Sequence, residues 1–188
     1  MKRWRWGGSV ACVAIGLLSL VNLGAAPAGD SLVISGDGVA QPHQWTVADL
    51  KSQFASQLSN ITYQSHGGAH TSACVPLLAV LKAAGVSTEL KMDPTADPRT
   101  KHLPLRMAIA AEARDGYVVV FSLAELLPEI GNRPVWIALD QDGQALAPKD
   151  GPVKLVVPED TKPARWIHAV DRLEVITLPT APAATQPS

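Results

Sequence analysis

The most informative segment of the sequence, SHGGAHTSACVPLLAVLKAAG, spans residues 65–85. Its first half is polar and contains two adjacent glycines, so we expect a loop over residues 65–73. In its second half, apolar residues recur every three or four positions, which predicts a helix over residues 76–84 with one buried face. Pro76 suits the first helical position, and Gly85 is a natural residue just past the end.

Three chemically versatile side chains lie in this stretch, namely His66, His70 and Cys74. Cys74 comes directly before the predicted helix, where the helix dipole favours a thiolate and lowers the pKa of a thiol. The alternative is a small, buried and inert side chain. The two histidines and Cys74 also offer a candidate zinc or copper site, although no fourth ligand is evident at a usual spacing. Otherwise the histidines shape a pocket.

The N-terminal segment, residues 1–28, has the three-part layout of a secretory signal peptide. Three basic residues precede an apolar run over residues 10–21, which is shorter than the ~20 residues that a membrane span needs. Small residues follow, and the sequence APA at 26–28 fits a cleavage site. No two arginines are adjacent in the basic part, so we expect Sec-type export to the periplasm or the medium, with no membrane attachment after cleavage.

Cleavage after residue 28 would leave thirteen basic and seventeen acidic residues, a net charge of −4. This balance argues against nucleic acid as a partner, because nucleic-acid binding calls for a basic face. We expect residues 29–178 to form one domain and residues 179–188, rich in Pro, Ala and Thr, to form a disordered tail. Cys74 would be the only cysteine left, so no internal disulfide can form.

Hydrophobic alternation and turn signals predict an α+β domain with an antiparallel or mixed sheet, several hairpins and three short helices. Asp-Gly pairs at 115–116 and 142–143 are hairpin turn signals. Thr46 and Ser122 each precede an acidic residue at the third position, which predicts capped helix starts. The expected strands cover residues 31–34, 61–63, 107–113, 117–121, 135–139, a run from 144, 153–157 and 166–176.

Four sequence segments, in this order and spacing, resemble the oxidoreductase molybdopterin-binding domain, the fold of sulfite oxidase and its bacterial relatives. They are QWTVADL at 44–50, VPLLAVLKAAG at 75–85, DGY followed by FSLAEL at 115–126, and DG at 142–143 followed by GPVKLVVP at 151–158 and RW at 165–166. The resemblance covers most of residues 31–177 and is closest to a small secreted branch of the family. It implies this fold, and molybdopterin as the cofactor of the family.

The chain also departs from the family at a position that bears on function. In the large catalytic members, the resemblance implies a cysteine ligand to molybdenum well before the helix, but residues 50–63 contain no cysteine. Cys74 instead replaces the glycine of the family's GVPL motif. We therefore expect a binding or accessory module without a cofactor. Two alternatives stay open: a molybdopterin-dependent oxidoreductase of small substrates that uses Cys74, and a metal-binding protein that uses His66, His70 and Cys74.

We expect a cofactor-type site for a small anionic or pterin-like ligand, formed by His66, His70 and Arg165. The loop at 65–73, the helix start and Arg165 should converge on one concave surface, because exposed backbone N–H groups and an arginine favour anions. Trp166 would offer a flat wall for a ring. If any residue is catalytic it is Cys74, which should lie within ~5 Å of this surface. The competing interpretation is that His66 and His70 point to solvent and that Arg165 lies on the far side of the sheet, where it covers a sheet edge or pairs with a surface carboxylate.

Overall fold

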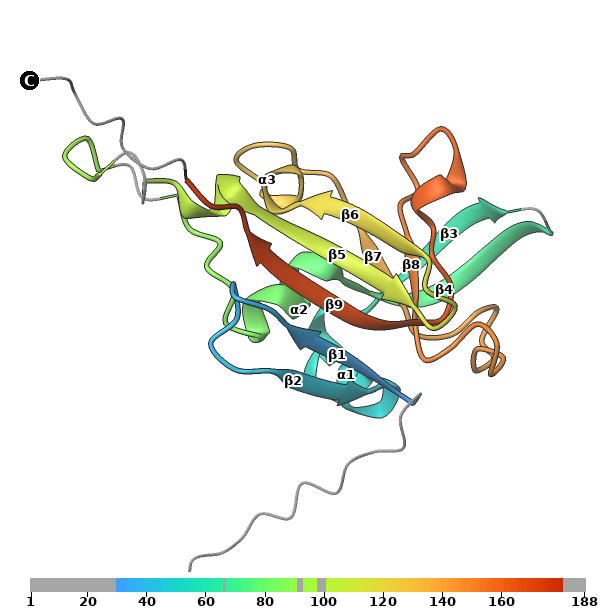
Figure 1. Cartoon of the computed structure of the whole chain (residues 1–188). Helices are drawn as coiled ribbons and strands as arrows, with labels where there is room; N and C mark the ends of the chain where they lie inside the picture. Colours follow the sequence, from blue (N-terminus) through green and yellow to red (C-terminus); the bar gives the residue numbers. More distant parts are fainter. Residues whose placement is uncertain (1–29, 66, 91–92, 98–100, 181–188) are drawn as a thin grey trace, which may run out of the picture.

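The computed structural model describes residues 30–65, 67–90, 93–97 and 101–180. The predicted signal peptide, His66 and most of the predicted tail lie outside these residues. The described chain forms two β-sheets accompanied by short helices (Figure 1), which confirms the predicted α+β class. None of the helices in the described ranges has the length and apolar character that a transmembrane span requires.

The larger sheet has five strands, and only β1 and β9 in it run parallel to each other. The predicted hairpin around the Asp-Gly pair at 115–116 is confirmed as β5 and β6. In spatial order the strands are β2 (His43–Thr46), β1 (Ser31–Ser35), β9 (Val170–Thr177), β5 (Met107–Ala113) and β6 (Val118–Ser122).

The smaller sheet has four strands, all antiparallel to their neighbours. Val153, just before its last strand, pairs with Val170 at the start of β9, so the two sheets meet at that point. In spatial order the strands are β3 (Ser59–Ser65), β4 (Gly68–Pro76), β7 (Trp136–Ala138) and β8 (Lys154–Val156).

The helices are short and begin where the sequence predicts. Thr46 and Ser122 cap α1 and α3, with Asp49 and Glu125 completing the two capping boxes. Pro76 is the residue before α2 rather than its first residue, a shift of one position from the prediction. The elements are α1 (Val47–Gln53), α2 (Leu77–Ala83), α3 (Leu123–Leu126) and the 3-10 turns η1 (Ala55–Gln57), η2 (Leu103–Arg106) and η3 (Pro163–Arg165).

The main hydrophobic core is shared by the two sheets and α2. Fully buried contributors include Leu32 and Ile109 of the larger sheet, Val75 and Leu155 of the smaller sheet, and Leu81 of α2. Successive strand residues point to opposite faces, so the face of the smaller sheet that is turned away from the main core carries its own buried side chains. These form a second, smaller cluster of Tyr63, Cys74, Ala138 and Val156, covered by Ile61, Trp136 and Trp166.

The prediction of a loop over residues 65–73 is wrong, because most of this segment is the strand β4 paired with β3. Every residue from Ser59 to Ser65 has a partner between Gly68 and Cys74. The Thr62 and Thr71 hydroxyl groups, which face each other across the pair, lie 2.9 Å apart and form a hydrogen bond. The polar side chains of this segment belong to an exposed hairpin. Exposed strands and loops are both polar, so polarity alone does not distinguish them.

The predicted hairpin around 142–143 is only partly present. Asp142 and Gly143 both have positive φ, as a tight two-residue turn requires, and Gln141 forms an isolated bridge with Gln144. The residues that follow form no strand. Both edges of β7 are already occupied, one by β4 and one by β8, so no edge is left for a strand from residue 144.

Candidate ligand site

The β3–β4 hairpin places the candidate side chains on one face of the smaller sheet. Its register pairs Tyr63 with His70 and Ser59 with Cys74. Residues directly opposite each other share a face, so Tyr63, His70 and Cys74 all lie on the side of the smaller cluster. The rings of Tyr63 and His70 are 6.2 Å apart, and the Tyr63 hydroxyl is hydrogen-bonded to the Ser72 hydroxyl at 3.1 Å.

Cys74 is fully buried and is the only cysteine in the described residues. Its Sγ donates a hydrogen bond to the Ser72 carbonyl oxygen at 3.4 Å. Burial, and after it the negative charge of Asp140, raise the pKa of Cys74 to about 12. The expectation of a lowered pKa is therefore wrong, because Cys74 belongs to β4 and α2 begins only at Leu77. The alternative of a buried side chain is confirmed.

A polar network joins the hairpin to β8 and to the turn after β7. Lys154 is only 6% exposed, donates to Gln141 Oε1 at 2.7 Å and lies 5.8 Å from the centre of the Tyr63 ring. The Gln141 amide lies 3.2 Å from His70 Nδ1, and Asp142 Oδ2 lies 2.7 Å from the same nitrogen. Burial lowers the pKa of Lys154 below its ordinary value. The network puts positive charge beside Tyr63.

A cavity of about 300 Å³ opens beside Tyr63 and Trp166. The two rings meet edge to face with their centres 5.4 Å apart, and Trp166 Nε1 donates to the Val157 carbonyl oxygen at 2.8 Å, which fixes the indole. The cavity thus has an aromatic wall and a polar rim. The rest of its lining comes from β3, from the chain before η3 and from the first residue of η3, and consists of Thr62, Gln64, Pro158, Asp160, Thr161 and Pro163.

Arg165 adjoins Trp166 in sequence, but it is not among the residues that line this cavity, and its guanidinium is paired with carboxylates. It lies 4.9 Å from the centre of the Phe121 ring and pairs with Asp160 at 2.8 Å and Glu125 at 3.1 Å. These carboxylates, Asp160 first, raise the pKa of Arg165. Neither Arg165 nor His70 lines this cavity, so a concave surface shared by the two stays a prediction, while the pairing of Arg165 with carboxylates is confirmed. A role for Arg165 as a cofactor ligand stays a prediction.

The proposed trio of metal ligands is not assembled in the described residues. His66 lies outside them, so its place in the site stays a prediction. His70 and Cys74 are four residues apart in one strand, which separates their Cα atoms by about 13 Å, too far to share one ion. In the ranges that the structure describes, no group of three histidine, cysteine or acidic side chains is placed to hold a metal ion.

Sequence reasoning missed Tyr63 and Lys154 as site residues. Tyr63 was expected only as a half-buried strand residue. Continuing the same alternation through residues 68–76 would have placed it opposite His70 and so at the site. No local signal connects residue 154 with residue 63, because their contact depends on β4 and β7 lying between their strands.

Comparison with known proteins places this chain in a family. The sequence matches the oxidoreductase molybdopterin binding domain over residues 24–182, and the chain belongs to that family. Among solved structures, it is similar to the crystal structure of the sulfane dehydrogenase SoxCD from Paracoccus pantotrophus, with a TM-score of 0.55 and 21% sequence identity. The similarity covers 78% of this chain and 38% of that chain, and it bears on the fold alone. No curated protein matches the sequence.

Proposed function

We propose that this chain is an exported binding module of the molybdopterin-binding family, which holds a small planar, anionic or pterin-like ligand and performs no redox chemistry itself. The ligand contacts come from the cavity beside Tyr63 and Trp166. His70 and Lys154 supply the polar surroundings on the other side of Tyr63. The proposal of export rests on the three-part layout of residues 1–28. The intact mass of the purified protein tests it, because the mass of an exported protein should correspond to a chain that begins at residue 29.

The state of Cys74 is the observation that carries this proposal. A cysteine binds molybdenum as a thiolate, and a thiol whose pKa is about 12 is protonated at neutral pH. Cys74 is also fully buried, and its thiol donates a hydrogen bond to a backbone carbonyl oxygen. In the described residues there is no second cysteine to take its place. The donor set in the described residues therefore does not fit a thiolate-ligated metal.

The chemistry of the cavity supports a flat heteroaromatic ligand. Trp166 and Tyr63 offer π-faces and edges on which such a ring can pack. Asp160 on the rim accepts hydrogen bonds from Arg165 and Arg133, yet its carboxylate still has free lone-pair capacity for a ring N–H. Lys154, buried close to Tyr63, favours a ligand that carries negative charge.

Titration with pterin-6-carboxylate, an anionic pterin, tests the ligand class. We expect saturable quenching of the pterin fluorescence, and a roughly fivefold to hundredfold weaker affinity in Trp166→Ala, as for aromatic stacking of nucleobases. Trp166→Phe keeps a ring and should recover part of the affinity. Trp45→Ala, which removes a half-buried tryptophan from β2, is the matched control and should bind normally. Equal binding by all variants, or none by the native protein, would contradict the proposed ligand.

The family description favours a second candidate, a molybdopterin-dependent oxidoreductase that uses Cys74. Metal analysis of protein purified from its native compartment separates the two. The binding module predicts no stoichiometric molybdenum and an unchanged metal content in Cys74→Ala. Stoichiometric molybdenum that disappears in Cys74→Ala would establish the oxidoreductase and overturn our proposal.

A further inference from the structure

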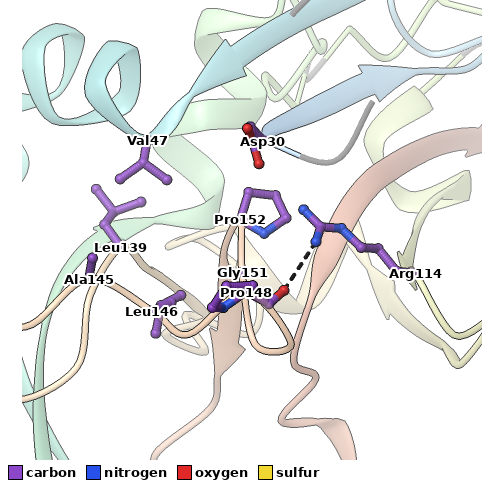
Figure 2. Close-up of a pocket in the computed structure, with 9 residues that line it drawn as sticks. All are labelled: Asp30, Val47, Arg114, Leu139, Ala145, Leu146, Pro148, Gly151 and Pro152. Atoms are coloured by element: carbon purple, nitrogen blue, oxygen red, sulfur yellow. Dashed lines mark hydrogen bonds between the residues drawn. The ribbon is translucent and has the colours of Figure 1, made fainter. Parts of the chain in front are cut away.

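A second cavity, of about 320 Å³, lies apart from the one beside Trp166 and shares no lining residue with it. It is bordered by the start of β1, the start of α1, the β5–β6 turn and the chain that connects β7 to β8 (Figure 2). Its size lies at the lower end of the range for small-molecule sites. Nothing in the proposed pterin site uses these residues.

This cavity has an apolar part and a charged part. Figure 2 shows the aliphatic side chains of Val47, Leu139 and Leu146 on one side of Pro152, while Asp30 and Arg114 lie above and on the other side of that ring. The arrangement suits a molecule with an aliphatic portion and two opposite charges.

The backbone and several contacts hold Arg114 in place without using all its donors. Its amide donates to the Ala169 carbonyl oxygen at 3.0 Å, and its Nη1 donates to the Pro148 carbonyl oxygen at 3.2 Å (Figure 2). The nearest carboxylate, Asp171, lies 4.0 Å from Nε, a loose ion pair. A guanidinium has five N–H donors, so several are left for an incoming carboxylate.

Asp30 supplies the opposite charge. Among the described residues, no hydrogen bond or ion pair joins its side chain to another group, so its carboxylate oxygens are free to accept. A carboxylate of this kind binds an ammonium group through charge-assisted hydrogen bonds.

We infer that this cavity binds a small zwitterion of the α-amino acid class with an aliphatic side chain. Arg114 binds the carboxylate, Asp30 binds the ammonium group, and the side chain packs against Val47, Leu146 and Pro152. The charged groups set the orientation of the ligand, and the apolar surface selects an aliphatic side chain over a polar one.

The test compares three probes by isothermal titration: L-leucine, its methyl ester, which lacks the carboxylate, and 4-methylpentanoate, which lacks the ammonium group. The full-length sequence is expressed, and the protein is purified in the form that the host cell exports, with any cleavage of residues 1–28 left to the host. L-leucine should bind at least roughly tenfold more tightly than either analogue, because each analogue loses one charge-assisted contact. No binding of L-leucine at millimolar concentration, or equal binding of all three probes, would overturn the inference.

Two variants identify the contacts. Arg114→Gln should weaken L-leucine and 4-methylpentanoate roughly tenfold and leave the methyl ester unchanged, while Asp30→Asn should weaken L-leucine and the methyl ester and leave 4-methylpentanoate unchanged. Lys149→Gln is the control, because it also removes one positive charge near the cavity, but Lys149 is not a lining residue. This variant should bind all three probes with the affinity of the native protein. The site would be contradicted if Lys149→Gln lowered the affinity as much as Arg114→Gln does. It would also be contradicted if a variant lost affinity for a probe that lacks the charge which the mutated residue is proposed to bind.

Discussion

At the scale of single residues, the position of Cys74 in a strand decides its chemistry. A residue directly before a long helix faces a row of free N–H groups, which stabilise a thiolate. Cys74 is separated from the seven-residue α2 by the rest of β4, and it is packed in the smaller cluster with Tyr63 and Val156. Desolvation of the charged form then dominates, and the thiol is held protonated.

This environment predicts how Cys74 reacts with a thiol reagent such as DTNB in a Cys12→Ala background. The thiolate fraction at pH 7 should be on the order of a thousandfold below that of a free cysteine of pKa ~8.5, and burial should slow the reaction further. The rate should keep rising above pH 9, where a free thiol levels off. The same protein unfolded in urea is the internal control. Fast, complete labelling of the folded protein would contradict the buried thiol.

At the scale of elements, a cluster of charges joins η3 to α3 and to the chain after β8. Arg165 on η3 donates to Asp160 and to Glu125 of α3, and Arg133 also pairs with Asp160. The Asp160 side chain is only 12% exposed, so its two arginine partners replace much of the water it loses. The cluster fixes the segment that presents Trp166 to the cavity.

Hydrogen bonds from Arg165, followed by the nearby arginine charges, lower the pKa of Asp160 below its ordinary value of 3.8. A carboxyl group whose pKa is lowered by folding stabilises the protein above that ordinary value, and this contribution is lost as the pH falls through the folded-state pKa. Asp160→Asn should therefore cost about 1–3 kcal/mol of unfolding free energy at pH 7.

The native protein and Asp160→Asn should differ less in their free energy of unfolding as the pH falls below 3.8. Urea unfolding at several pH values measures this difference. Glu129→Gln, a charge removal on an exposed loop, should show little effect at any pH. A difference for Asp160→Asn that stays constant down to low pH would show that the carboxyl charge is not the cause.

At the scale of the whole molecule, the two sheets form one cooperative unit because they share a core. Leu155 of β8 is 1% exposed and belongs to the same buried cluster as Leu32 of β1 and Ile109 of β5. The bridge between Val153 and Val170 adds a backbone connection between the sheets. Loss of packing at one sheet should therefore destabilise the other.

Leu155→Ala tests this coupling. It should reduce the unfolding free energy by about 2–5 kcal/mol, because it leaves a cavity in a fully buried site. Far-ultraviolet circular dichroism and tryptophan fluorescence should report one coincident urea transition, shifted as a whole. Val120→Ala on the exposed face of β6 is the control and should change stability by less than about 0.5 kcal/mol. Separate transitions for the two probes would mean that the sheets unfold independently.

Local sequence patterns correctly predicted several elements, and the family. Short-range rules were enough for the capped starts of α1 and α3 and for the β5–β6 hairpin, since each depends on residues within a few positions of one another. Contacts between distant residues also constrain the sequence: a side chain at Gly36, whose φ is positive, would overlap the backbone of Val175 in β9.

The chemistry of the candidate site depends on contacts between residues that are distant in the sequence. Whether residues 65–73 form a loop or a strand depended on pairing with β3, because their polar composition suits both. The pKa of Cys74 depended on burial under Tyr63 and Trp166, and the guanidinium of Arg165 is occupied by Asp160 and Glu125. Each of these outcomes is set by contacts between residues that are distant in the sequence, and by the water that those contacts exclude. The local spacing of residues in the sequence does not encode such contacts.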